Sequence, residues 1–170
     1  MPAFKLITDE ALYAEVLSRK VPHAKEYLWI ATANIKNLYI ERSGSYVPFL
    51  ALLAELARNG VNISLLHATE AGPSFRKEFD KHPGLIERIE RMVCPRVHFK
   101  SIIVDGDFAY TGSANLTGAG LGAKRPNRRN FENGIITTDT KLVQQIREQF
   151  LDIWTGKRCK DCGRKEYCDE

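Results

Sequence analysis

The sequence predicts an α/β fold in which a mixed central β-sheet is flanked by helices on both faces. Apolar runs of strand length alternate with amphipathic segments of helical length along the chain. In addition, Asp105-Gly106 lies between two apolar runs and is a strong β-hairpin signal, which makes the sheet mixed. A chain of 170 residues can bury one full core. We therefore expect one domain at 1–156, followed by a short cysteine-rich tail at 157–170 that packs on it.

The first half of the chain should supply two helices and two strands. Thr8 is a candidate N-cap because Asp9 and Glu10 would then lie in the first helical turn. Asn59-Gly60 is typical of a helix C-terminus. The expected elements are a helix at 8–19, a strand at 26–33, a helix at 48–58 and a strand at 61–67.

The second half contains the hairpin and the clearest helix. Residues 74–93 are charged and should be helical in two pieces, because Pro83 cannot continue a helix. The hairpin follows at 97–115 and a strand at 134–138. An amphipathic helix at 140–154 should end at Gly156.

The hairpin gathers polar side chains on one face. If its loop has two residues, His98 lies opposite Ser113, and opposed residues share a face. Lys100 and Asn115 would point the same way because side chains alternate along a strand. A cation, a hydroxyl and an amide suit anionic oxygens, and a neutral imidazole can attack phosphorus or take a proton. This face is therefore predicted to bind and react with a phosphate group.

Asp105 does not belong to that face. It lies roughly 23 Å from His98 along an extended strand of about 3.3 Å per residue. We interpret it as a turn residue.

This spacing resembles the HKD signature of the phospholipase D superfamily. The matching motif reads His98-x-Lys100-x4-Asp105-x6-Gly112-Ser113-x-Asn115. The resemblance implies a phospholipase D-like catalytic half-unit with a nucleophilic histidine and a second histidine as general acid. It makes His98, Lys100, Ser113 and Asn115 catalytic, and Asp105 and Gly112 structural. Glu132 would correspond to the acidic residue that orients the nucleophile.

The chain carries one such motif, whereas other superfamily members carry two. It is therefore similar to the small single-motif branch, in which two copies share one active site. The chemistry needs a second proton-transfer group, and a homodimer would supply it as His98 of a second copy.

A basic, glycine-rich loop separates the motif from Glu132. The formal net charge is only +4, but four cations cluster here: Lys124, Arg125, Arg128 and Arg129. They are candidate contacts to neighbouring phosphates of a polyanion. The alternative is an ordinary solvated loop.

Three cysteines close the chain in the pattern Cys159-x2-Cys162-x5-Cys168, and Cys94 is the only other. In a cytosolic protein this spacing favours a structural metal site over disulfides. Zinc and a [4Fe-4S] cluster both fit four thiolates. The triplet resembles the C-terminal iron-sulfur staple of RecB-like nucleases. Free thiols on a frayed terminus are the remaining alternative. No catalytic metal is expected.

These observations favour a metal-independent phosphodiesterase, an endonuclease that cleaves DNA or RNA through a phosphohistidine intermediate. One alternative keeps the residues but acts on phospholipid headgroups, as a phospholipase D or phosphatidyltransferase. Another is a catalytically quiet nucleic-acid binding module. The longest apolar stretch, 46–57, contains Pro48 and Glu55 and is too short to cross a bilayer. No secretory signal is visible, so a cytoplasmic location is expected.

Overall fold

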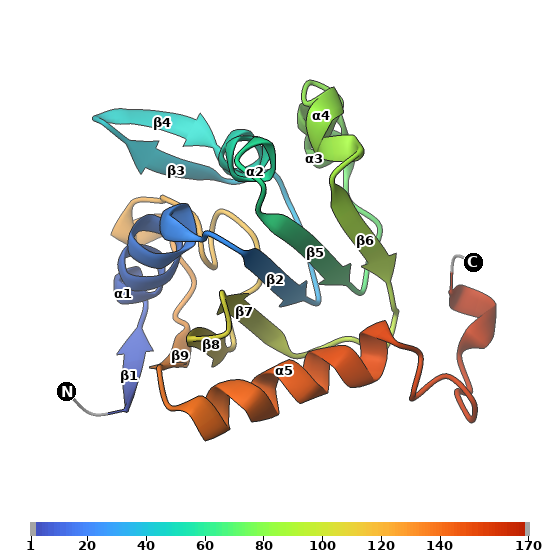
Figure 1. Cartoon of the computed structure of the whole chain (residues 1–170). Coiled ribbons are helices and arrows are strands. Elements are labelled where there is room, and N and C mark those ends of the chain that lie inside the picture. The colour runs from blue at the N-terminus through green and yellow to red at the C-terminus, as the bar shows by residue number, and fades with distance from the viewer. Residues whose placement is uncertain (1–2, 169–170) are drawn as a thin grey trace.

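A computed structural model describes residues 3–168 and has a seven-stranded sheet at its centre (Figure 1). In space the strands follow the order β1-β9-β8-β7-β2-β5-β6. β2, β5 and β6 run parallel, and the remaining neighbours are antiparallel. The mixed sheet expected from the sequence is confirmed. Its strands are β1 (Phe4–Thr8), β2 (Tyr27–Thr32), β5 (Asn62–His67), β6 (Ile89–Val93), β7 (Lys100–Val104), β8 (Phe108–Gly112) and β9 (Asn133–Thr137).

Helices cover both faces of this sheet, as predicted. The amphipathic helix α5 (Thr140–Trp154) runs along one face (Figure 1). Its N-cap Asp139 accepts a hydrogen bond of 2.9 Å from Leu142 N. On the other face lie α1 (Glu10–Leu12), which continues into π-helical turns η1 (Tyr13–Lys20) and a 3-10 turn η2 (Val21–His23), then α2 (Phe49–Arg58), α3 (Pro73–Phe79) and α4 (Pro83–Ile86).

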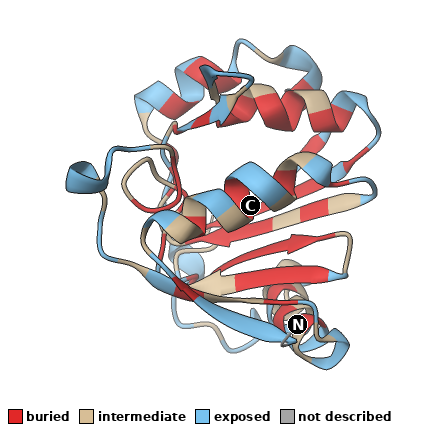
Figure 2. Ribbon diagram, turned by 90° about the vertical axis from the view of Figure 1, so that its left-hand side faces the viewer, coloured by how far each residue is buried: buried red, intermediate tan, exposed pale blue. Residues whose placement is uncertain are grey.

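Two apolar clusters correspond to the two faces. Alternate residues of one strand enter different clusters: Ile102 packs towards α2, and Ile103 towards α5. Phe150 of α5 stacks on Trp29 of β2, with ring centroids 5.1 Å apart. All five residues of β7 are buried, and its three apolar side chains, Ile102, Ile103 and Val104, are divided between the two clusters. The buried residues line both sides of the sheet in Figure 2.

The expected helix over 74–93 is only partly present. It ends with α4 at Ile86, and Ile89–Val93 form strand β6 instead. β6 pairs with β5 alone, at the edge of the sheet, where the exposed Glu90 and Arg91 are tolerated. Their charge made this strand look like a solvated helix.

Two further strand pairings were not expected. β1 pairs antiparallel with β9 where the sequence predicted only the start of a helix at Thr8. β3 (Tyr39–Arg42) and β4 (Ser45–Pro48) form a separate hairpin. The predicted body and tail meet just after α5. Residues 1, 2, 169 and 170 of those predicted segments lie outside the described residues.

The turn between β7 and β8 differs from the prediction by one residue. Its loop has three residues, because Val104 pairs with Phe108 rather than with Asp107. Asp105 and Gly106 both adopt left-handed backbone conformations, with φ of 51° and 74°. Lys100 consequently lies opposite Gly112. The predicted register, which also paired His98 with Ser113, is therefore wrong by one residue.

Asp105 holds this turn to the start of β2. Its carboxylate accepts hydrogen bonds from three consecutive backbone N–H groups: Lys25 at 2.9 and 3.1 Å, Glu26 at 2.8 Å and Tyr27 at 3.0 Å. Its own N–H donates to Tyr27 O at 3.0 Å. One side chain thus fixes β7 relative to β2.

Within residues 3–168, none of the helices has the length and apolar character needed to cross a bilayer.

We expect Asp105→Asn to lower the free energy of unfolding by about 1–2 kcal/mol, because charge-assisted hydrogen bonds become neutral ones. Asparagine tolerates the left-handed backbone, so the loss reports on the carboxylate. Urea denaturation measures it, and Asp107→Asn in the same loop is the matched control. Equal effects of the two changes would contradict the anchoring role of Asp105.

Candidate active site

Polar residues converge at one end of the sheet, where several strands begin or finish. The N-terminal ends of β7 and β9 meet the C-terminal ends of β2 and β8 there, since each neighbouring pair among them is antiparallel. We call this end of the sheet the candidate active site. Its residues are His98, Lys100, Ser113, Asn115 and Glu132.

Lys100 is a buried cation at the start of β7. It is 7 % exposed, and its Nζ donates to His98 O at 2.6 Å. Burial lowers the pKa of Lys100, and the nearby negative charge of Glu132 opposes this shift. Gly112 lies opposite, where a Cβ would approach Asn133 O to 2.4 Å. Only glycine fits this close contact between β8 and β9.

Glu132 is held by neighbouring side chains rather than by the histidine. Its Oε2 accepts a short hydrogen bond from Ser113 Oγ, and its Oε1 accepts one of 3.1 Å from Asn130 Nδ2. Ser113 Oγ also accepts a hydrogen bond from Asn133 N at 3.1 Å. The Ser113 hydroxyl proton is therefore directed at Glu132, and the serine positions this carboxylate.

Asp9 fixes the backbone of Glu132 from the other end of the chain. Glu132 N donates to Asp9 Oδ1 at 3.0 Å, and Asp9 N donates to Glu132 O at 2.9 Å. Asp9 has a left-handed φ of 49°. The sequence analysis assigned it only to a first helical turn, and no local signal marks a contact between residues so distant in the chain.

Asn115 is oriented through its carbonyl oxygen. Its Oδ1 accepts a hydrogen bond of 3.0 Å from Asn34 N and lies 3.3 Å from Thr32 Oγ1. The backbone N–H of Asn34 requires an acceptor, which identifies the oxygen of the amide. Both N–H donors of Asn115 Nδ2 consequently point away from β2. Thr32, buried at the end of β2, also accepts from Leu116 N at 2.9 Å and was not identified from the sequence.

The His98 ring is exposed, and nothing in residues 3–168 hydrogen-bonds to it. The contact with Glu132 that the resemblance implied is not formed; the Glu132 carboxylate accepts from Ser113 and Asn130 instead. The imidazole is accessible to a ligand or to another molecule. The candidate active site thus presents His98 as a nucleophile or base, Lys100 as a fixed cation and Asn115 as a fixed amide donor.

The basic loop divides into two kinds of residue. Arg129 donates to Gly122 O at 2.5 Å and also reaches Gly120 O and Asp9 O. Its guanidinium therefore holds the loop to the region of α1. By contrast, the side chains of Lys124, Arg125 and Arg128 are exposed.

A cavity of about 500 Å³ opens between this loop and the β3–β4 hairpin. Its walls combine the aromatic rings of Tyr13, Tyr39 and Tyr46 with three cations, Lys124, Arg125 and Arg129, and two carboxylates, Glu10 and Glu41. Arg129 is followed by Asn130, which contacts Glu132, so the loop that lines this cavity leads directly to the candidate active site.

The four cysteines lie elsewhere, around a second cavity beside the end of α5. Across residues 3–168, no three Cys, His, Asp or Glu side chains are close enough together to hold a metal ion as they stand.

Comparisons with known proteins agree with the fold described above. The family model described as "Cardiolipin synthase, PLD-like domain" matches residues 17–154. Among solved structures, the phospholipase D family member Nuc from Salmonella typhimurium superposes with a TM-score of 0.65 at 19 % identity, over 91 % of this chain and 95 % of that one. NucT from Helicobacter pylori gives 0.64 at 15 % identity, over 89 % and 95 %. TrmBL2, an archaeal chromatin protein, gives 0.59 at 13 % identity, over 91 % and 54 %. No curated protein sequence matches the chain.

We expect Asn115→Ala to lower the free energy of unfolding by about 1–3 kcal/mol, because the N–H of Asn34 loses its acceptor. Asn115→Asp keeps an acceptor oxygen at that place and should be closer to the wild type. Urea denaturation of both variants measures the difference. If alanine and aspartate prove equally stable, Oδ1 does not fix this side chain.

Proposed function

The chain belongs to the PLD-like domain family defined by that model, and we propose that it is a metal-independent phosphodiesterase that cleaves nucleic acid. The observation that carries the proposal is that Lys100 and the Asn115 amide are held in place at the end of the sheet where the exposed His98 imidazole lies. Both donors suit the non-bridging oxygens of a phosphodiester.

In the proposed reaction, His98 attacks phosphorus and the bond to the leaving oxygen breaks. A phosphohistidine forms, and a second imidazole gives its proton to the leaving oxygen. That second imidazole then takes a proton from water, whose oxygen displaces the histidine and completes hydrolysis. Lys100 and Asn115 Nδ2 stabilise the negative charge on the non-bridging oxygens in both steps. Glu132 keeps Lys100 charged against the burial that lowers its pKa.

The second imidazole would come from a second copy of this chain. One copy presents a single exposed histidine at the site, and His98 has no partner among the described residues to share a proton with. A twofold axis beside the site would bring two such rings together and would add a second Lys100 and Asn115. Dimerisation is therefore part of the proposed mechanism. A partner group would also orient the ring, the role that the resemblance gave to Glu132.

The cavity beside the site favours a nucleic acid as substrate. Tyr46 is 64 % exposed and Tyr39 is 46 % exposed, next to the cations of the basic loop. Exposed aromatic rings stack on unpaired bases, and cations follow the phosphate backbone. We therefore propose that a single strand passes from this cavity to His98. TrmBL2 has a similar fold, and its structure shows a mode of DNA binding, which is consistent with this substrate class.

The name of the matching family model keeps a phospholipid headgroup as the second candidate. Both substrates present a phosphodiester to the same residues. They differ in what surrounds the phosphate.

We expect His98→Gln to lower the cleavage of single-stranded DNA or RNA by at least about 10³-fold, because the nucleophile is lost. His23→Gln, a change at another exposed histidine, is the control and should remain active. A chelator added only during the assay should leave cleavage intact once folding is controlled for. Trapping a base-stable, acid-labile phosphoprotein from the wild type would report the intermediate. Undiminished turnover by His98→Gln would refute the mechanism, and release of choline from phosphatidylcholine vesicles without nuclease activity would favour the lipid candidate.

For the substrate cavity, we expect Tyr46→Ala to weaken single-strand binding by about 1–3 kcal/mol, because one base loses its stacking partner. Lys124→Gln should reduce the slope of the logarithm of the binding constant against the logarithm of the salt concentration by about one, because one phosphate contact is lost. Fluorescence anisotropy with a labelled oligonucleotide at several salt concentrations measures both effects. Lys77→Gln on the exposed surface of α3 is the charge-matched control. Unchanged affinity in both cavity variants would place the strand elsewhere.

A further inference from the structure

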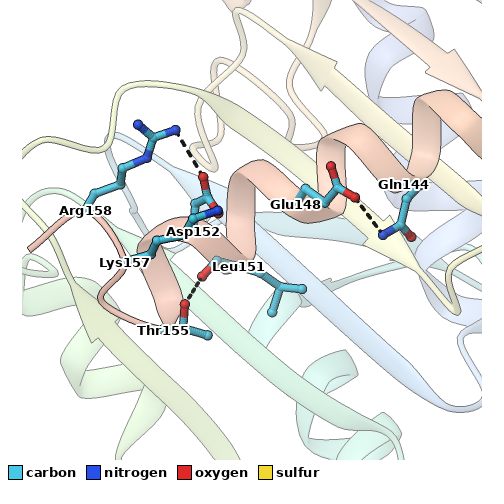
Figure 3. Close-up of polar contacts among 7 residues, drawn as sticks. All are labelled: Gln144, Glu148, Leu151, Asp152, Thr155, Lys157 and Arg158. Carbon is cyan, nitrogen blue, oxygen red and sulfur yellow. Dashed lines mark hydrogen bonds and ion pairs between the residues drawn. The ribbon is translucent and has the colours of Figure 1, made fainter.

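The tail that follows α5 has no apolar anchor. None of the residues 155–168 is buried, and its one regular element is a 3-10 turn, η4 (Lys165–Tyr167). Asp152 on the last turn of α5 binds Lys157 Nζ at 2.8 Å and Arg158 at 3.1 Å (Figure 3). Exposed ion pairs of this kind contribute little to stability. Another interaction is needed to hold the tail on the body.

Three cysteines of this tail face one cavity. Cys162 N donates to Cys159 O at 3.2 Å, which closes a tight turn between these two residues. Cys168 follows η4 and lines the same cavity of about 650 Å³. The cysteines are thus gathered on one side of the tail.

The fourth cysteine comes from the body of the protein. Cys94 directly follows β6, its N–H donates to His67 O at 2.9 Å, and its side chain packs against the apolar cluster under α5. It lines the same cavity as the three tail cysteines. One anchored thiol therefore faces three thiols on a segment that burial does not hold.

We propose that Cys94, Cys159, Cys162 and Cys168 together bind one structural metal centre that fastens the tail to the body. The thiols as they stand are not at coordinating distances, so binding would draw the tail inward by a small closure around the cavity. Four thiols that bind Zn²⁺ release four protons and leave a site of net charge 2−. A [4Fe-4S]²⁺ cluster held by four thiolates carries the same net charge.

The charges around the cavity suit an anionic centre. Four cations line it: Arg96, Lys157, Arg158 and Lys165. Arg96 belongs to the body of the protein and lines the cavity together with Cys162. Hydrogen-bond donors and cations near the sulfur atoms stabilise metal-bound thiolates. Asp152 and Asp161 are the carboxylates in the wall, and Asp152 is paired with two of the cations.

The centre would also support the active site without taking part in the reaction. Val97 and Phe99, on either side of His98, line this cavity, whereas His98 itself does not. The segment from Cys94 to His98 would then be fixed at one end by the metal and at the other by β7. The tail would act on cleavage only by positioning this segment.

Elemental analysis and an absorption spectrum of the full chain, purified without added metal and without oxygen, test the proposal. We expect about one zinc per chain and no visible absorption, or about four irons per chain with a brown colour. Cys159→Ser and Cys94→Ser should each reduce the metal content to background. Lys160→Ser, in the same turn as Cys159, should retain it. Because Cys159 is exposed, its replacement should leave the body folded, as circular dichroism would show.

Limited proteolysis gives a readout besides metal content. Cleavage of the tail should be slow in the wild type and in Lys160→Ser, and fast in Cys159→Ser or after removal of the metal by a chelator. A metal-free wild-type protein would overturn the proposal, and so would disulfides between these cysteines in mass spectra of the intact chain. Metal retained by Cys94→Ser would exclude the body from the site and overturn the fastening role.

Discussion

The register of β7 between β2 and β8 is the constraint on which the candidate active site depends. β7 is buried on both faces, and its two neighbours hold it by antiparallel ladders. Asp105 adds a polar anchor at the far end of the hairpin, where it binds the first residues of β2. Because side chains alternate along a strand, a shift of one residue would move Lys100 to the opposite face of the sheet. The apolar core and the turn together prevent that shift.

Around this frame, the polar residues of the motif divide into those that face the ligand and those that position others. Asn115 binds the end of β2 through its oxygen, which leaves its nitrogen free to donate. Ser113 and Asn130 hold the Glu132 carboxylate, while Asp9 holds its backbone. The cost of reorganising these groups is met during folding, so they need not rearrange when a phosphate arrives.

Two segments beyond this frame extend the proposed chemistry. The loop at 116–130 is held on its inner side by Arg129 and presents cations outward, towards a cavity whose tyrosines come from η1 and the β3–β4 hairpin. The tail beyond α5 lines a cavity together with Val97 and Phe99, the two neighbours of His98 in the chain. In both places the sheet provides a rigid support. The exposed segments provide the surface that would bind a single strand of nucleic acid or a metal centre.

The sequence by itself determined the α/β class, most of the helices and strands, and the identity of the motif, because these depend on apolar periodicity and on spacing along the chain. Helix α5 lies at the predicted residues, and the single motif indicated the family. The sequence misassigned 89–93, where an edge strand carries charges like a helix surface. Only the tertiary structure decided the three-residue turn, the clamp of Asp9 on Glu132 and the orientation of Asn115 by β2. These features arise from contacts between residues far apart in the chain. A pattern of neighbouring residues contains no information about the register between two strands or about which distant backbone group a side chain contacts.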